Sequence, residues 1–151
     1  MQCDTIYDVK LIFDTDVVVA AVRSPSGASA ALIRALQAGQ VKVAASVALF
    51  VEYEATCTRA EHLLASGWQM QDLTDFLDAL AGLMEHTEIH FMWRPQVRDP
   101  ADDMVLEAAV NAMADAIVSF NVRDFGDAPQ RFGTQVLLPR DALARVRALN
   151  H

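Results

Sequence analysis

Lysine and cysteine are both scarce in this chain of 151 residues. The lysines are Lys10 and Lys42, so arginine carries most of the positive charge, and arginine suits bidentate phosphate contacts. The cysteines are Cys3 and Cys57. Two cysteines so far apart in the sequence exclude a disulfide framework and a cysteine-based zinc site.

A signal sequence and long hydrophobic runs are missing as well. The N-terminal stretch MQCDTIYDVK has no basic start followed by an apolar segment, so we expect no signal peptide. No apolar run approaches the ~20 residues of a membrane span. These absences predict a cytoplasmic protein without a membrane partner.

Positive charge is in deficit, because 12 lysines and arginines face 20 aspartates and glutamates and the formal net charge is −8. Phosphate neutralisation needs basic residues, so an acidic chain is a poor non-specific binder of nucleic acid. A nucleic-acid enzyme of this composition needs part of its acidity in a metal site, where bound cations reverse the local sign. Hydrophobic residues make up 53% of the chain, which suits one packed domain over residues 1–151.

Hydrophobic periodicity and turn residues predict strands that alternate with helices. Strands are expected at residues 9–13, 41–45, 87–92, 116–120 and 135–138, and helices at residues 28–38, 47–57, 61–66, 71–84, 100–113 and 141–149. The apolar residues 17–22 continue the run of the first strand. The alternation favours a three-layer α/β/α sandwich whose central sheet has about five strands, mostly parallel. In such sheets the functional site lies beyond the carboxyl ends of the strands.

Acidic residues stand at several of these strand ends and helix starts. Asp14 follows the first strand and Asp124 follows the fourth, while Glu52 and Asp103 lie early in helices that follow strands. Each of them taken alone is also explained as a turn, capping or surface residue. Taken together, all four can reach one edge of a parallel sheet.

Carboxylates crowded at one edge repel each other, and their pKa values rise unless a cation lies between them. Hard oxygen ligands select Mg²⁺ or Mn²⁺ rather than zinc. The histidines have no spacing typical of metal ligands; they are His62, His86, His90 and His151. The pattern therefore predicts a divalent-cation site made of carboxylates.

The motifs, in their order along the chain, resemble those of the PIN-domain ribonuclease family. Asp14-Thr15-Asp16-Val17 is similar to the family's opening, usually Asp-Thr-Asn-Val. Further similarities lie in residues 24–27 (SPSG), Ser46 with Glu52-Tyr53, residues 98–103 (RDPADD), 114–125 (ADAIVSFNVRDF) and 136–139 (VLLP). This set resembles the subgroup that contains the toxin components of bacterial toxin–antitoxin pairs.

The resemblance implies site residues in this chain. Catalytic and metal-binding roles fall on Asp14, Glu52, Asp103 and Asp124. Supporting roles fall on Thr15, Asp16, Ser119 and Asn121. The chain departs from the family's pattern twice, since Asp16 replaces the usual Asn and Ser119 the usual Thr. The first change adds negative charge beside the site.

The activity implied is hydrolysis of RNA phosphodiester bonds by an endoribonuclease that depends on Mg²⁺ or Mn²⁺. One or two ions would activate a water molecule and stabilise charge on the leaving oxygen. Arg98 and Arg123 flank the acidic motifs and are candidates for RNA phosphate contacts. The resemblance also implies an antitoxin protein as partner and a homodimer.

Two alternatives stay open at this point. The chain could be a PIN-fold binding module with weakened catalysis, which Asp16 and the low isoelectric point favour. It could also be a phosphatase of the haloacid-dehalogenase type, since residues 13–17 fit that family's opening and Asp102-Asp103 could be its metal pair. That chemistry needs a lysine past the middle of the chain, and neither Lys10 nor Lys42 lies there.

Overall fold

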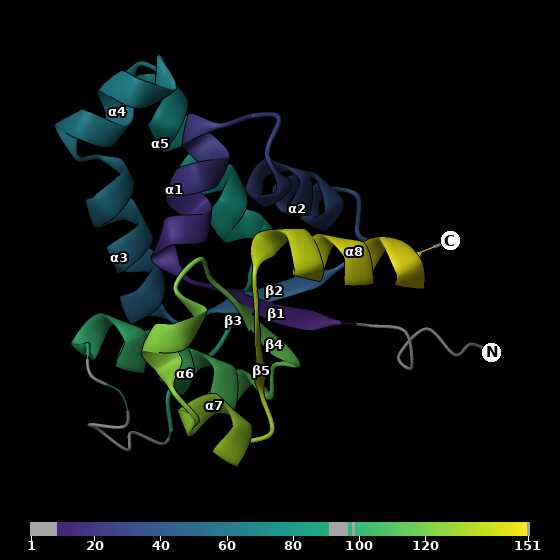
Figure 1. Ribbon diagram of the computed structural model, residues 1–151. Coiled ribbons are helices and arrows are strands. Elements are labelled where there is room, and N and C mark those ends of the chain that lie inside the picture. Colours follow the sequence, from purple (N-terminus) through teal and green to yellow (C-terminus); the bar gives the residue numbers. More distant parts are fainter. Residues whose placement is uncertain (1–8, 91–96, 98, 151) are drawn as a thin grey trace.

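The computed structural model describes residues 9–90, 97 and 99–150, in which strands and helices alternate (Figure 1). The strands are β1 (Lys10–Phe13), β2 (Lys42–Ala45), β3 (Glu85–His86), β4 (Ala116–Val118) and β5 (Gln135–Leu137). The helices are α1 (Thr15–Arg23), α2 (Ala28–Gln37), α3 (Val47–Cys57), α4 (Ala60–Ser66), α5 (Met70–Leu83), α6 (Pro100–Ala112), the 3₁₀ helix η2 (Val122–Phe125), α7 (Ala128–Arg131) and α8 (Pro139–Leu149).

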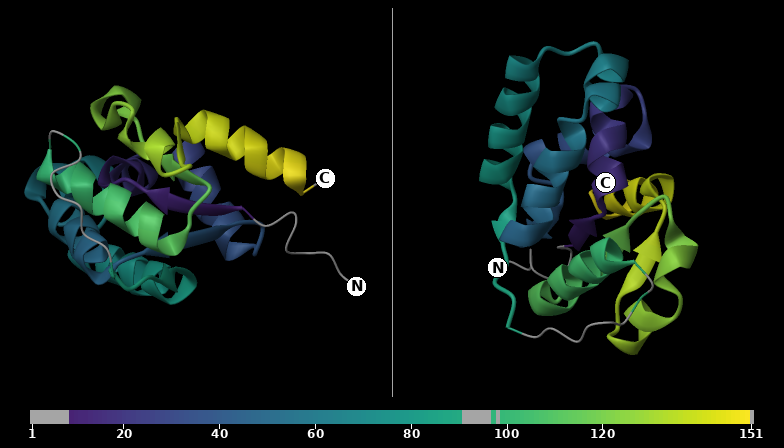
Figure 2. Two further views of the ribbon diagram at one scale, coloured as in Figure 1. Left: turned by 90° about the horizontal axis from the view of Figure 1, so that it is seen from below. Right: turned by 90° about the vertical axis from the view of Figure 1, so that its left-hand side faces the viewer.

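The sheet has five strands in the order β3-β2-β1-β4-β5, and all of its pairings are parallel. Helices α1, α2 and α8 lie on one face and α6 lies on the other, while α3 contacts both α1 and α6 (Figures 1 and 2). Helix α4 lies at the opposite end of the molecule from α7 in Figure 1 and in the right-hand view of Figure 2. The predicted three-layer α/β/α sandwich is confirmed.

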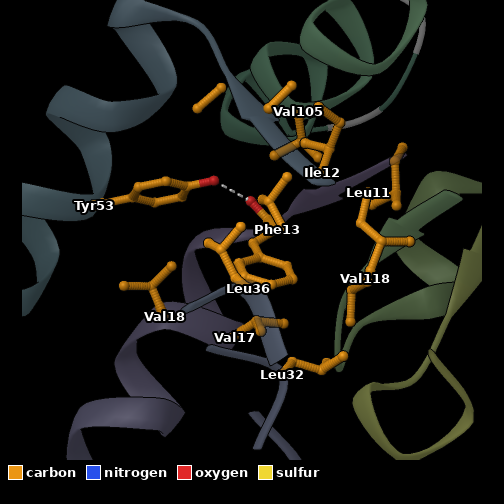
Figure 3. Packing of buried hydrophobic residues seen from close by; sticks show 14 of the residues in the cluster. Leu11, Ile12, Phe13, Val17, Val18, Leu32, Leu36, Tyr53, Val105 and Val118 are labelled. Carbon is orange, nitrogen blue, oxygen red and sulfur yellow. Dashed lines mark hydrogen bonds between the residues drawn. The ribbon is translucent and has the colours of Figure 1, made fainter. Parts of the chain in front are cut away.

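The central strand β1 is the middle of the core. Leu11, Ile12 and Phe13 are all buried, as expected of a parallel strand covered on both faces. The hydroxyl of Tyr53 in α3 donates a hydrogen bond to the carbonyl oxygen of Phe13 at 2.5 Å (Figure 3). This bond fixes the middle of α3 against the carboxyl end of β1, next to Asp14.

Residues 17–22 form most of helix α1, so their assignment to the run of the first strand was wrong. A valine-rich stretch has high β propensity, which hid the helix. The side chain of Asp14 caps this helix by accepting from the Thr15 backbone N–H at 2.8 Å. Val17 and Val18 are fully buried in the core, and this packing outweighs the local propensity.

The third strand was also misplaced. It occupies Glu85–His86, residues 87–90 lie outside any strand, and residues 91 and 92 lie outside the described part of the chain. The Thr87 backbone N–H still donates to the Ala45 carbonyl oxygen at 3.0 Å, so the pairing with β2 extends slightly beyond the strand. Strand β4 is shorter than predicted and ends at Val118, and the short helix α7 was not predicted.

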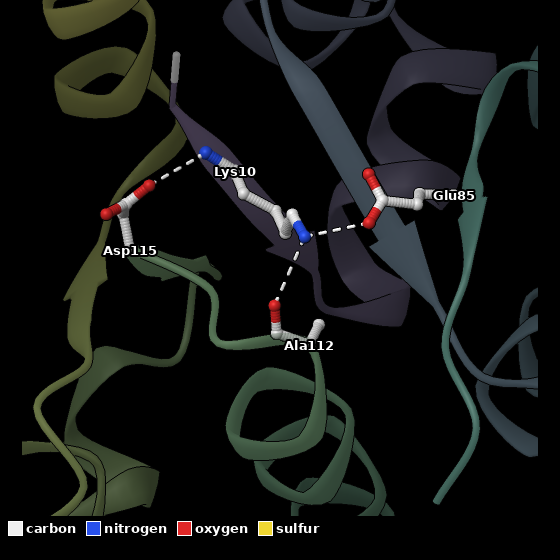
Figure 4. A network of polar contacts seen from close by, with 4 residues as sticks. All are labelled: Lys10, Glu85, Ala112 and Asp115. Atoms are coloured by element: carbon white, nitrogen blue, oxygen red, sulfur yellow. Dashed lines mark hydrogen bonds and ion pairs between the residues drawn. The ribbon is translucent and has the colours of Figure 1, made fainter. Parts of the chain in front are cut away.

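The amino ends of the strands are tied together by Lys10 (Figure 4). Its ammonium lies 2.7 Å from a carboxylate oxygen of Glu85 and 3.2 Å from the carbonyl oxygen of Ala112. The Lys10 backbone N–H donates to the carboxylate of Asp115 at 2.9 Å. This lysine is therefore engaged at the edge opposite the one where Asp14 lies.

None of the described helices is by itself long and apolar enough to cross a membrane; α1 and α2 reach the required length only together, across a 97° bend.

Candidate active site

Asp14 lies at the carboxyl end of β1 and is buried, with 7% of its surface exposed. Its carboxylate accepts hydrogen bonds from the Thr15 backbone N–H at 2.8 Å and from the Ser119 hydroxyl at 2.6 Å. The Ser119 oxygen also accepts from the Asn121 backbone N–H at 2.9 Å. Burial raises the pKa of Asp14, and the hydrogen bond from Ser119 opposes this rise. Adjacent strands β1 and β4 thus bring residues from two distant motifs into contact.

Asp16 lies in the first turn of α1 and faces the same loop after β4. One carboxylate oxygen, Oδ2, accepts from the Phe120 backbone N–H at 3.1 Å and from the Asn121 side-chain amide at 3.0 Å. The other, Oδ1, is buried without a hydrogen-bond partner among the described residues. Burial and then the charge of Asp14 raise the pKa of Asp16 to about 7. A buried carboxylate oxygen without a donor is a place for a cation or a water molecule.

Helix α6 brings more carboxylates to this edge. Asp99 caps the helix by accepting from the Ala101 backbone N–H at 2.9 Å, and Asp102 and Asp103 are both buried in its first turn. Burial, and then the charges of Asp14 and Asp99, raise the pKa of Asp102 to about 6. Asp102 therefore belongs electrostatically to the group around Asp14.

Asp103 has a different environment, because its carboxylate accepts from the Val97 backbone N–H at 3.3 Å. The sequence predicted Asp103 as the metal-binding residue and offered Asp102 only as part of the metal pair of a phosphatase. Successive helical residues differ by ~100° in direction, so the adjacent pair in RDPADD does not reveal which member faces the sheet edge. The adjacent aspartates of the sequence indicated an acidic site. Which side chain faces the sheet edge depends on how α6 packs, and this is known only from the structure.

The remaining predicted ligands lie on other elements, and only Asp124 is electrostatically coupled to Asp14 and Asp102. Asp124 is exposed in η2, and its charge contributes to the raised pKa values of Asp14 and Asp102. Glu52 is half-buried in α3 and accepts from the Thr56 hydroxyl at 3.3 Å. Of the predicted RNA contacts, Arg123 is exposed on η2 beside Asp124, and Arg98 lies outside the described residues.

The chemistry of this edge suits a hard divalent cation. Asp14, Asp16 and Asp102 have raised pKa values, which is the effect of burial and mutual repulsion that a bound cation relieves. The unpartnered Oδ1 of Asp16 adds an available oxygen. Within residues 9–90, 97 and 99–150, however, no three acidic, histidine or cysteine side chains converge closely enough to form a ligand shell.

Three surface grooves meet at Phe120, whose side chain is 49% exposed. The first has a volume of about 520 Å³ and is lined by Thr15, Asp16 and Glu52, together with Arg23, Arg59 and His62. The second, about 410 Å³, passes between α2 and the start of α8. The third, about 540 Å³, is lined by Asn121, Arg123 and Asp124. Several of the predicted site residues thus line grooves that share one exposed aromatic ring, whereas Asp14, Asp103 and Ser119 line none of the three.

Comparison with known proteins places this geometry in a family. Residues 10–123 match the family model described as PIN domain. The matched range begins at β1, includes Asp14, Glu52 and Asp102, and ends one residue before Asp124. None of the curated proteins compared with the chain matches it. The chain belongs to the PIN-domain family, whose members are typically nucleases that use divalent metal ions.

Proposed function

We propose that this protein is an endoribonuclease that hydrolyses RNA phosphodiester bonds with the help of Mg²⁺ or Mn²⁺, and that it is the toxin of a bacterial toxin–antitoxin pair. The observation that supports the nuclease is a group of carboxylates at the carboxyl edge of the sheet, in which Asp14 and Asp102 are buried and Asp16 is half-buried. The pKa values of all three are raised. None of the three forms an ion pair within the described residues. Buried charges without a counter-charge are stabilised by a metal ion.

The chain's own residues have separate tasks in this proposal. Asp14, Asp124 and one member of the pair Asp102 and Asp103 hold the cation, and Glu52 completes the acidic edge. The cation, when bound, supplies a Lewis acid that activates water and stabilises charge on the leaving oxygen. The Ser119 hydroxyl holds the Asp14 carboxylate in one orientation.

Other residues hold the carboxylates in position or are proposed to contact the RNA. The amide of Asn121 and the N–H of Phe120 hold Asp16, while Thr15 fixes Asp14 through its backbone N–H. Arg123 is exposed beside Asp124 and is suited to an RNA phosphate; Arg98 is proposed for the same role from the motif alone.

The charge and the exposed apolar surface of the protein support the two proposed partners, an antitoxin and a second copy of the chain. An antitoxin with a basic segment would complement the acidic edge and the net charge of −8. Val47 and Val51 of α3 are 63% and 54% exposed, and covering them in a homodimer would remove apolar surface from water. Both partners are proposals.

A matched pair of aspartate variants tests the nuclease. Labelled RNAs of mixed structure are incubated with the wild-type protein, Asp14→Asn and Asp115→Asn, each with Mn²⁺ or with EDTA. Asp115 lies at the opposite edge of the sheet, so its substitution is the matched control. We expect metal-dependent cleavage that falls about 100-fold or more in Asp14→Asn and persists in Asp115→Asn. Equal cleavage by wild type and Asp14→Asn would remove the proposal.

A PIN-fold binding module without cleavage is the second candidate. The observation that favours it is the absence of a three-residue ligand group among the described side chains. The additional charge of Asp16 points the same way, because the family usually has Asn at this position. This candidate predicts RNA binding without cleavage in the same assay and little stabilisation of the protein by Mn²⁺.

A further inference from the structure

We infer that the groove between α1, α3 and α4 binds a segment of single-stranded RNA, with an unpaired base stacked on Phe120 and phosphates held by Arg23 and Arg59. The inference rests on the proposed function. It names the surface that would distinguish single-stranded from double-stranded RNA. The groove has a volume of about 520 Å³ and shares Asp16 and Glu52 with the candidate active site.

The first support is the exposure of Phe120. The side chain is 49% exposed although it directly follows the fully buried Ser119. Its backbone N–H donates to Asp16 at 3.1 Å, so the residue is anchored to the carboxylate edge. An anchored ring open to solvent is a stacking platform for any base, because every base has a π-face. Stacking of this kind needs an unpaired base, which favours a single strand.

The second support is the basic group that lines the groove. Arg23 from α1, Arg59 before α4 and His62 in α4 all line it, in a chain whose net charge is −8. Arg23 donates to Nδ1 of His62 at 3.1 Å, which holds the two side chains together. Neither arginine forms an ion pair with any described carboxylate, and both are exposed. Guanidinium groups of this kind bind phosphate oxygens in pairs of hydrogen bonds.

The third support is the combination of apolar, basic and acidic side chains that line the groove. Apolar residues Val19 and Ala20 of α1 line the same groove as the two arginines and as Asp16. A nucleotide has the same parts, a flat apolar base and an anionic phosphate. In the inferred complex the phosphates contact the arginines and the base stacks on Phe120, in a groove that Asp16 and Glu52 also line.

The test measures RNA binding separately from cleavage. The Asp14→Asn protein serves as the background, and binding of a fluorescein-labelled single-stranded RNA is followed by fluorescence anisotropy at several salt concentrations. Four substitutions are added singly: Arg23→Ala, Arg59→Ala, Phe120→Ala and Phe120→Trp. Arg147→Ala is the matched control, because this exposed arginine of α8 lines none of the grooves that meet at Phe120.

We expect each arginine variant to weaken binding several-fold and to lower the salt slope by about 0.7 per lost phosphate contact. Phe120→Ala should weaken binding about tenfold, and Phe120→Trp should retain it because the stacking face is kept. Arg147→Ala should bind as the background does, and a duplex of the same sequence should bind more weakly. A loss in Arg147→Ala as large as in Arg23→Ala, equal binding by Phe120→Ala and Phe120→Trp, or equal binding of the duplex would overturn the inference.

Cleavage by the protein with Asp14 intact separates this inference from the proposed function. Metal-dependent cleavage together with unchanged binding in the groove variants would overturn the inference alone. Binding through the groove without any cleavage would support the inference and remove the nuclease.

Discussion

The Asp16 carboxylate stands where the PIN family usually has an uncharged Asn, and its surroundings explain how the charge is accommodated. Two donors from the loop after β4 satisfy Oδ2, while Oδ1 is buried without a donor among the described residues. Because the pKa of Asp16 is about 7 in the folded protein and 3.8 ordinarily, the metal-free folded protein keeps this proton between those two pH values, whereas the unfolded chain has lost it. A single side chain therefore links folding to pH and to cation binding.

The stability of the metal-free protein should fall as the pH rises from about 4 to about 7. In that range the folded state binds the Asp16 proton and the unfolded state does not, so raising the pH favours unfolding. Asp16→Asn removes this linkage. In EDTA at pH 8 the variant should melt at a higher temperature by roughly 2–4 °C for each ~1 kcal/mol recovered, and at pH 4.5 it should melt close to the wild type. Thermal melts at both pH values measure the difference. An equal effect at both would show that the charge is not responsible.

Sequence reasoning at this scale found the acidic residues but not their directions. Sequence reasoning gave Ser119 a supporting role only through the family resemblance, and its hydrogen bond to Asp14 is known from the structure. The choice between Asp102 and Asp103 depended on how α6 rotates against the sheet, which no local pattern encodes. The half-exposed Phe120 gave no sequence signal, because exposure depends on what packs around a residue.

At the scale of elements, the helices were predicted best where capping and periodicity agreed. Ser46 caps α3 by accepting from the Leu49 backbone N–H at 3.1 Å, and Gly67 ends α4 in the left-handed conformation. Helix α1 was missed because its valines favour a strand locally and become helical through burial against α2 and α3. Tertiary packing therefore determined the element that carries Asp16.

Helix α6 ends at Met113, which has φ 56° and is 86% exposed. A side chain in this left-handed region is strained, whereas glycine adopts it freely. Met113→Gly should raise stability by about 0.5–1 kcal/mol, which corresponds to a melting temperature higher by roughly 1–4 °C. Met113→Ala, which also removes the exposed side chain but keeps a Cβ, is the control and should give no such gain. A gain as large in the alanine variant would point to the lost apolar side chain instead of the backbone.

In the molecule as a whole, the order of the strands determines which residues meet at the candidate site. Strands β1 and β4 are neighbours although a hundred residues separate them, and their carboxyl ends carry Asp14 and Ser119. Alternating strands and helices were enough to predict a parallel sheet with helices on both faces. They did not fix the order β3-β2-β1-β4-β5, because the same alternation fits several parallel arrangements. The site could therefore be expected at one edge, while the contacts within it had to come from the structure.

The proposed function depends above all on whether the carboxylates at this edge bind a divalent cation. The most direct test is calorimetric titration of Mn²⁺ into the wild-type protein, Asp14→Asn, Asp102→Asn and the opposite-edge control Asp115→Asn, at a pH where the carboxylates are ionised. We expect the wild type and Asp115→Asn to bind Mn²⁺ alike, and Asp14→Asn and Asp102→Asn to bind it at least about tenfold more weakly. A wild-type protein that takes up no Mn²⁺, or an Asp14→Asn protein that binds it equally well, would show that these carboxylates do not form a cation site.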